Sequence, residues 1–336
     1  MTQTPDAQTP ETRTPETRTP ETRTPDDRAP QARTPEAAFT ANRSLLVGVA
    51  YRLLGSVGDA EDVVQEAWLR WARVDVDTVA DPTGFLVRIV SRLALDRLRR
   101  VAARRETYVG PWLPEPVLTG GPAAPVPVGD PADEAERASS VSLAMLVVLE
   151  TLSPLERTVF VLHEAFAYSY AEIAEILDRS PAAVRQLAHR AREHVAARRP
   201  RFPTDPAARR AATERFLHAT LSGDLAALMD LLAPDAALWA DGGGKFKAPL
   251  RPIHGADKIA RFFVAIGVEA LAPDQAVEIR EINGGPAAVL LGPAGPVAVL
   301  QVDLGDDGRV SDVRMMGNPD KLAGLAPLRP SGGTAC

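Results

Sequence analysis

Between residues 38 and 108, apolar side chains recur every three or four positions, a spacing typical of amphipathic helices. We expect the first helix to end at Gly58 and the second to begin with Asp59 as its N-cap. Asp81 followed by Pro82 predicts a third helix that continues to about residue 105. The first segment is therefore predicted to be all-helical. The positions expected to face its core are Leu45, Leu46, Val49, Ala50, Leu53, Leu54, Val63, Val64, Ala67, Trp68, Trp71, Phe85, Leu86, Ile89, Val90 and Leu93.

Between residues 133 and 200, three helix starts follow one another closely. Two are capping boxes, Ser153 with Glu156 and Ser169 with Glu172, and the third is Ser180 before a proline. The stretch YAEIAEILDRSPAAVRQLAHRAREHV then predicts a helix, a tight turn and a second helix, although packed helical hairpins share this pattern. Its inward positions are Val184, Leu187, Ala188, Ala191 and Val195. The outward positions, suited to reading purine edges in a major groove, are Arg185, Gln186, His189, Arg190 and Arg192.

Residues 205–326 have a different pattern. Two helices are expected between residues 205 and 232, separated by Gly223 and Asp224, and another over residues 255–267. Alternating apolar runs separated by Gly and Pro turns predict strands at 236–240, 276–282, 287–291, 296–304 and 310–316. Helices followed by a curved antiparallel sheet predict an α+β fold. The chain is thus expected to be multidomain, with two all-α domains before an α+β domain.

The stretches before, between and after these predicted domains have low-complexity sequences. Residues 1–37 contain Thr-Pro units repeated every five positions, which predict a disordered tail serving as a spacer or as a docking or phosphorylation segment. Residues 109–132 are rich in proline and predict a flexible linker. Residues 200–206 form a shorter break, and residues 327–336 are expected to be a flexible tail.

Composition removes several classes of protein. The chain has 336 residues and a net charge of −6, and no apolar run approaches the length of a membrane span or signal peptide. Because Cys336 is the only cysteine, a disulfide framework and a Cys-rich zinc site are excluded. His163, His189 and His194 lack a carboxylate at ligand spacing, so we expect solvated or packed histidines rather than a metal site. A cytoplasmic protein with no cofactor is expected.

Two predicted helices carry charge of one sign. From Arg88 to Arg105 there are seven arginines against one acidic residue, Asp96, which favours a phosphate-facing surface over a merely soluble helix. The preceding helix is acidic. Carboxylates in a first helical turn suit the helix dipole, but these extend further along one face and could meet a basic partner. The acidic-helix residues are Asp59, Glu61, Asp62, Gln65 and Glu66.

These residues carry a resemblance to a known family. The sequences GDAEDVVQEAWLRWAR and FLVRIVSRLALDRLRR resemble region 2 of bacterial RNA polymerase sigma factors of the extracytoplasmic-function group, and the helix-turn-helix resembles region 4. The resemblance implies that the acidic-helix residues dock on the β′ clamp helices, that region 4 reads the −35 element and contacts the β flap, and that core polymerase and promoter DNA are the partners. Many members have Asn where Arg92 stands. The resemblance assigns the −10 element to Arg88, Arg92, Arg97, Arg99 and Arg100.

The third segment looks like the SnoaL-like branch of the nuclear-transport-factor-2-like superfamily. Three motifs, WLPEP, DGGGK and NPDKL, resemble the signature of an extracytoplasmic-function subgroup whose fused extension controls activity in place of an anti-sigma protein. Read plainly, they are a stiff spacer, a flexible hairpin loop and an Asn-Pro turn. We expect the first two to form a docking surface and the third to latch it. The residues are Trp112, Leu113, Pro114, Glu115, Pro116, Asp241, Gly242, Gly243, Gly244, Lys245, Asn318, Pro319, Asp320, Lys321 and Leu322.

Three functions are therefore to be compared. The main hypothesis is a promoter-recognising sigma factor without catalytic activity, controlled by its own C-terminal domain. In the second, the C-terminal domain is an isomerase or cyclase, or binds a small ligand, with Asp241 or His254 as the candidate base. Asp241, beside three glycines, is expected in a surface loop. The third, a helix-turn-helix repressor, leaves the first segment unexplained.

Overall fold

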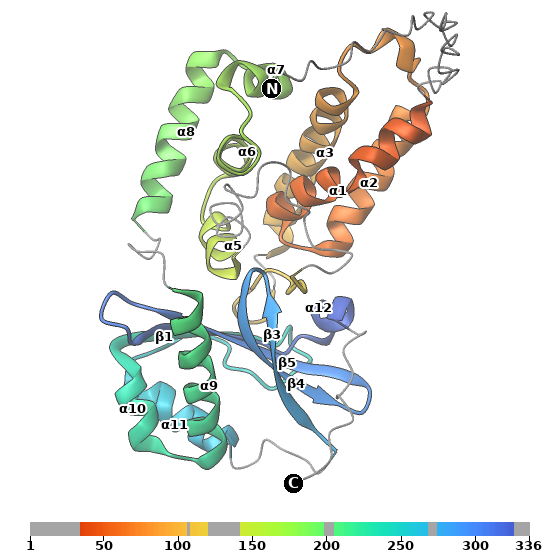
Figure 1. Cartoon of the computed structure of the whole chain (residues 1–336). Coiled ribbons are helices and arrows are strands. Elements are labelled where there is room, and N and C mark those ends of the chain that lie inside the picture. Colours follow the sequence, from red (N-terminus) through yellow and green to blue (C-terminus); the bar gives the residue numbers. More distant parts are fainter. Residues whose placement is uncertain (1–33, 106–107, 120–141, 198–204, 268–273, 326–336) are drawn as a thin grey trace, which may run out of the picture. The chain divides into compact units, whose positions relative to one another are not determined.

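Three helices pack against one another in the first domain: α1 (Pro35–Leu54), α2 (Val57–Trp71) and α3 (Pro82–Arg105) (Figure 1). The structure, a computed structural model, describes residues 34–105, 108–119, 142–197, 205–267 and 274–325. The 3₁₀ helix η1 (Val76–Thr78) lies between α2 and α3. Of the predicted core positions, Leu46, Leu53, Trp71 and Leu86 are fully buried. The predicted helical segment is therefore confirmed.

The first helix begins inside the predicted tail. Thr34 is its N-cap and accepts a hydrogen bond from the amide of Ala37 at 3.1 Å, with Pro35 at the first helical position. The ring nitrogen of Trp71 also donates to the carbonyl of Pro35, at 2.8 Å. Residues 35–37 are thus helical, which corrects the expectation for them, whereas residues 1–33 lie outside the described residues. The last Thr-Pro unit starts a helix because apolar residues follow it.

The junction between α1 and α2 also differs from the prediction. Gly55 ends α1 in the left-handed conformation, with φ 69°, and Ser56 caps α2 by accepting from the amide of Asp59. Gly58 and Asp59 therefore lie in the first turn of α2. A Cβ atom at Gly55 would lie 2.7 Å from the ring of Trp112, so the glycine serves both the turn and a close approach.

The second domain comprises α5 (Leu143–Leu149), α6 (Pro154–Phe160), the π-helix η3 (Val161–Ala165), α7 (Tyr170–Leu177) and α8 (Pro181–Ala196). Both predicted capping boxes are present, and Ser180 caps α8. The tight turn after α7 uses Asp178 in the left-handed region, with φ 53°. The predicted helix-turn-helix is confirmed, including the five buried core positions of α8.

The third domain begins with α9 (Pro206–Ser222) and α10 (Leu225–Leu231), followed by α11 (Ala256–Gly267). Its strands are β1 (Leu232–Asp241), β2 (Ile253–His254), β3 (Ala276–Ile282), β4 (Gly285–Gly292), β5 (Gly295–Leu304) and β6 (Val310–Met316). The chain closes with α12 (Pro319–Leu322) and the 3₁₀ helix η4 (Ala323–Leu325). The predicted α+β class is confirmed.

The strands form one sheet in the order β2-β1-β6-β5-β4-β3. Every neighbouring pair is antiparallel except β1 and β6, which run parallel, so the expectation of an antiparallel sheet is wrong at this pair. Helices α9, α10 and α11 cover one face (Figure 1). The opposite face packs Met316 and Val289 against Leu113 and Leu322. Two separate apolar layers therefore flank the sheet.

Within the described residues, none of the helices is long and apolar enough to cross a membrane.

Candidate functional site

Residues 108–119, which we name the strap, pack against the junction between α1 and α2. The amide of Glu115 donates to the carbonyl of Gly55 at 2.8 Å, and the Glu115 carboxylate accepts from the amide of Val57 at 2.7 Å. Leu113 and Val117 are buried. Residues 109–119 are thus packed, which corrects the expectation of a flexible linker, and residues 120–132 lie outside the described residues. Burial raises the pKa of the Glu115 carboxyl.

The strap also binds the hairpin between β3 and β4. Asn283, at φ 51°, accepts from the amide of Val117 at 3.0 Å through Oδ1 and donates its own amide to the Val117 carbonyl at 2.8 Å. The Asn283 side-chain nitrogen donates at 2.7 Å to the Tyr51 hydroxyl, which itself donates to the Glu115 carbonyl at 2.7 Å. Burial raises the pKa of Tyr51, so its hydroxyl remains a donor. One asparagine therefore connects α1, the strap and the sheet.

Asp241 is a second anchor for the strap. It ends β1 and is fully buried, which corrects the expectation of a surface-loop aspartate. Its Oδ1 accepts from the Tyr108 hydroxyl at 2.6 Å and the Gly243 amide at 3.1 Å. Its Oδ2 accepts from the Leu113 amide at 2.8 Å and Lys321 Nζ at 2.7 Å. A buried carboxylate with four donors and a paired cation is satisfied and holds its neighbours in one geometry.

Lys321 completes this anchor from α12. Its ammonium lies 4.0 Å from the ring centroid of Trp112 and 5.0 Å from that of Tyr108, and it donates to the Leu113 carbonyl at 2.5 Å. The side chain is only 11% exposed, which strengthens these contacts. The tryptophan of WLPEP therefore packs against the lysine of NPDKL.

The other residues of DGGGK and NPDKL also pack near Asp241 and Tyr108. Asn318 donates to the Tyr108 hydroxyl at 2.8 Å, and its backbone amide donates to the Asp241 carbonyl at 3.1 Å. Gly243 has φ 57°, and a Cβ there would lie 2.3 Å from the Asn318 amide nitrogen, so a larger residue would clash. Lys245 binds Asp320 at 2.7 Å at the exposed edge. The structure thus brings WLPEP, DGGGK and NPDKL into one cluster, which we name the three-motif cluster.

The acidic-helix residues lie on α2, where Glu61, Asp62, Gln65 and Glu66 are exposed and Asp59 is half-buried. Arg97, predicted to bind DNA, instead contacts Asp59 and lies 3.1 Å from Asp62. Residues assigned to two different partners are therefore paired with each other in this arrangement.

Two other predicted DNA-binding arginines contact the end of α7. Arg92 donates to the carbonyls of Ile176 at 2.7 Å and Glu175 at 3.3 Å, which belong to the last turn of that helix. Arg88 forms an ion pair with the Glu175 carboxylate at 3.1 Å. Arg99 pairs with the Asp96 carboxylate at 3.1 Å, Arg100 donates to the Asp96 carbonyl at 3.3 Å, and both arginines are exposed. The basic face of α3 is thus divided between covered and exposed arginines.

The predicted −35 residues project from α8, and all five are exposed. Arg190 pairs with Glu156 at 3.2 Å, Arg192 with Glu164 at 2.7 Å, and His189 lies 3.5 Å from Glu193. Their outward direction follows from burial of the opposite face of α8.

Tyr51, Tyr108 and Asn283 contact the strap or the three-motif cluster, although the sequence did not predict them as site residues. An Asn-Gly pair is a hairpin signal, and Asn283 does stand between β3 and β4, but its neighbours across the chain were not foreseeable. Likewise, buried Arg157 donates to the Arg52 carbonyl at 3.0 Å and pairs with Glu150 at 2.5 Å, which fastens α6 to the end of α1.

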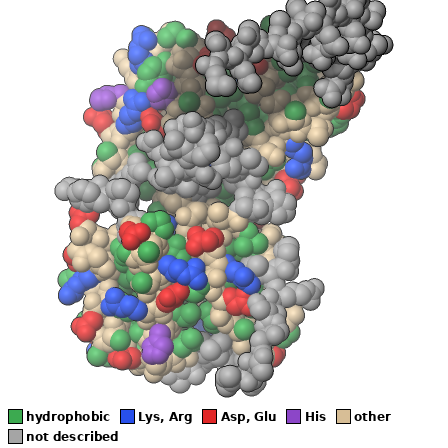
Figure 2. Space-filling view, viewed as in Figure 1, with side chains coloured by type: hydrophobic (Ala, Val, Ile, Leu, Met, Phe, Trp, Pro, Cys, Tyr) green, Lys and Arg blue, Asp and Glu red, His purple; other side chains and the backbone are tan. Residues whose placement is uncertain are grey.

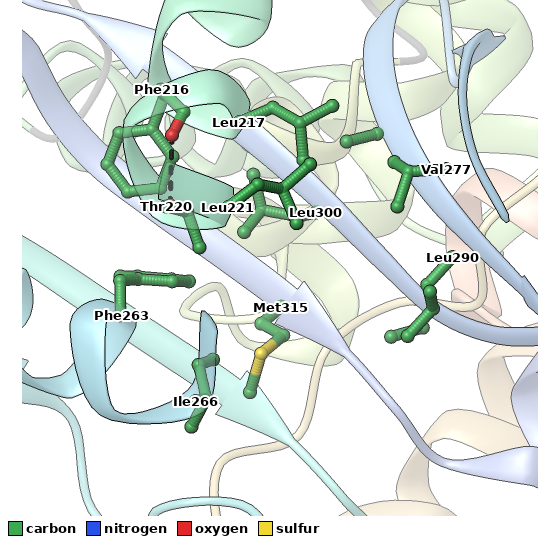
Figure 3. Close-up of a pocket in the computed structure, with 12 residues that line it drawn as sticks. Phe216, Leu217, Thr220, Leu221, Phe263, Ile266, Val277, Leu290, Leu300 and Met315 are labelled. Atoms are coloured by element: carbon green, nitrogen blue, oxygen red, sulfur yellow. Dashed lines mark hydrogen bonds between the residues drawn. The ribbon is translucent and has the colours of Figure 1, made fainter. Parts of the chain in front are cut away.

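A cavity of about 100 Å³ lies between the helices and the sheet of the C-terminal domain (Figure 3). Neither Asp241 nor His254 lines it, and His254 is exposed on the short strand β2. Among the lining side chains that belong to the described residues, none is an acid or a base. The two candidate bases of the enzymatic hypothesis therefore lie outside the lining of this cavity. No cluster of three or more His, Cys, Asp or Glu suited to a metal ion occurs in the part of the chain that the structure describes.

Acidic and basic side chains are intermixed on the face of the C-terminal domain visible in Figure 2. A phosphate-binding surface favours charge of one sign, so this face is not suited to extend the DNA-binding surface.

Comparisons with known proteins agree with this architecture. The family model described as Sigma-70 region 2 matches residues 38–105, and the one described as Sigma-70, region 4 matches residues 142–195. The chain is 42% identical over 303 residues to the ECF RNA polymerase sigma factor SigJ of Mycobacterium tuberculosis, covering 87% of this chain and 94% of the relative. It is 40% identical over 202 residues to a probable ECF RNA polymerase sigma factor, SigI, of the same species, covering 60% of this chain and 68% of the relative.

A solved structure extends the likeness to all three domains. The crystal structure of the Mycobacterium tuberculosis extracytoplasmic function sigma factor SigJ is similar with a TM-score of 0.67 and 39% identity, covering 88% of this chain and 100% of that one.

Proposed function

This chain belongs to the extracytoplasmic-function sigma factors of RNA polymerase, and from that premise we propose that its C-terminal domain controls transcription through the strap. As a sigma factor, it binds core polymerase, recognises promoter DNA and initiates transcription. The finer proposal concerns how these steps are restrained and by which residues. It requires a cytoplasmic location, because polymerase and promoter are there, and it assigns the chain no catalytic step of its own.

This proposal rests on the observation that the strap binds both the helices of region 2 and the sheet of the C-terminal domain. The strap holds α1 and α2 through Glu115 and holds the sheet through Asn283 and the three-motif cluster. Because the strap follows α3 in the chain, any shift of the C-terminal domain pulls on the segment that leads out of region 2. The docked strap therefore couples the domain to the sigma regions.

The proposal assigns DNA recognition to two exposed surfaces. On α3, Arg99 and Arg100 contact the melted −10 strand, while Arg88 and Arg92 join them after leaving α7. On α8, the five outward residues contact the −35 element, and the acidic face of α2 binds the β′ clamp helices. The arrangement with α7 against Arg92 is then a restrained form that must open before full promoter contact.

Two truncations test the control. Ending the chain at Gly317 removes Asn318 and Lys321 and should raise run-off transcription with purified core polymerase, by about 5- to 150-fold for a typical coupling between sites. Ending it at Pro203 removes the whole domain, leaves the apolar side of the strap uncovered, and should lower transcription. Lys245→Ala, at the exposed edge of the same cluster, is the matched control and should behave as wild type.

The outcomes separate the hypotheses. Equal transcription by both truncations and full-length protein would show that the domain does not act by contact. Promoter-specific transcripts from any of these chains would still exclude the simple repressor, because a repressor does not start transcription with core polymerase.

A further inference from the structure

The described side chains that line the cavity in the C-terminal domain are apolar, apart from Thr220. Side chains from α9 and α11 form one side, and side chains from β3 to β6 form the other (Figure 3). Phe216 and Phe263 meet edge to face, with ring centroids 4.9 Å apart, and form an aromatic wall. Ala288 and Ala298, small residues on adjacent strands, leave space opposite them. The cavity is therefore shaped by two aromatic rings and two alanines.

The chemistry of this lining selects its ligand. The one hydroxyl, that of Thr220, donates to the Phe216 carbonyl at 2.9 Å, so its donor is already used (Figure 3). The other described side chains of the lining are apolar, so a charged ligand would lose its hydration without finding a counter-ion among them. A water molecule would also find too few polar partners here. Burial of apolar surface is the available source of binding energy.

We infer that this cavity binds a small, uncharged apolar molecule about the size of one aromatic ring. An apolar protein cavity of about 150 Å³ accommodates benzene or xenon, and the volume here is about 100 Å³. A modest shift of rim side chains supplies the difference, since Leu217 and Ile266 are half-buried and Leu221 is 38% exposed. The rim also gives the ligand a path from solvent. This site goes beyond the proposed control of transcription, and it holds or fails independently of it.

The cavity is joined to the three-motif cluster by a single strand. Met315 of β6 lines the cavity, while the next residue, Met316, packs on the opposite face of the sheet beside Leu113 of the strap. The amide of Gly317 then donates to the Asp241 carbonyl at 2.8 Å. A ligand that displaces Met315 therefore acts on the strand that ends in the cluster.

Methyl NMR on the full-length chain tests the binding directly, with benzene as the probe. The chain has five methionines, and selective methyl labelling gives each a separate signal. We expect a saturable ring-current shift of the Met315 methyl, with Met316 and Met145 changing far less. Benzoate, which adds a charge, should leave Met315 unshifted at the same concentration. The Met315→Leu variant assigns the signal.

A cavity-filling pair makes the test specific. Ala298→Leu fills the space and should weaken benzene binding by about tenfold or more, since overpacking a core competes with the ligand. The matched control, Ala208→Leu on the exposed surface of α9, should bind as wild type. If Ala298→Leu does not fold, the smaller change Ala288→Val replaces it.

Three results would overturn the inference. They are no saturable shift of Met315 up to the solubility limit of benzene, equal shifts of Met315 and Met316, or benzoate binding as strongly as benzene. Because none of these measurements uses polymerase, failure here leaves the proposed control of transcription intact.

Discussion

Replacing Asp241 with asparagine removes the central charge of the three-motif cluster and keeps its shape. The carboxylate is fully buried, and its partner Lys321 is only 11% exposed. It accepts from four donors, whereas an amide must turn an NH₂ group toward two of them. Removing one partner of a buried ion pair costs about 3–5 kcal/mol, because the other charge stays desolvated. We therefore expect strap docking to weaken by about 150- to 5,000-fold, since about 1.4 kcal/mol is tenfold.

Hydrogen exchange at the Leu113 amide measures this weakening of strap docking. The Leu113 amide donates to Asp241 Oδ2 at 2.8 Å, so it should exchange much faster in Asp241→Asn than in wild type. The burial of Tyr108 and its bond to Asp241 raise the pKa of that phenol, so it stays protonated and can donate to the oxygen that Asp241→Asn retains. Lys245→Ala is the control. Its pair with Asp320 is exposed and contributes about 0–1 kcal/mol, so exchange at Leu113 should be unchanged.

Two results would refute the reasoning. If Leu113 exchanges at the wild-type rate in a folded Asp241→Asn protein, the carboxylate does not hold the strap. If exchange accelerates equally throughout α11, the substitution has loosened the whole domain rather than the strap.

Three further predictions follow from the contacts. Because burial raises the pKa of Glu115, its contribution to strap docking is greatest at low pH and falls as pH rises through a value above 4.5. Glu115→Gln should flatten the pH dependence of hydrogen exchange in the strap. The same pH profile in this variant as in wild type would contradict the prediction. Replacing Arg99 and Arg100 with alanine should lower the slope of log affinity against log salt by about 2 and abolish permanganate-detected opening without loss of core binding. Reversing Asp62 and Glu66 to lysine should reduce capture of core polymerase by about tenfold, and equal pull-down by a folded variant would refute that assignment.

The predictable part of the fold is the part whose signals are local. Ser153 with Glu156 and Ser169 with Glu172 satisfy their own helix ends, so the caps could be identified from four consecutive residues. The strands β3 to β6 follow from alternation between turns, because their side chains face two different apolar layers. Local signals also mislead when two compete: Ser56, not Asp59, caps α2, because Gly55 had already ended α1.

The motifs WLPEP, DGGGK and NPDKL were recognisable in the sequence, but the sequence did not show that they contact one another in one cluster. Sequence predicted helices, strands, the helix-turn-helix and the charge of each face, since these depend on neighbours a few residues away. Only tertiary structure buried Asp241, packed the strap and turned Arg97 toward Asp59. Tyr51 and Asn283 are 232 residues apart, and nothing near either one specifies the other. Their contact arises because a buried hydroxyl and a buried amide must find partners, and the folded chain offers them each other.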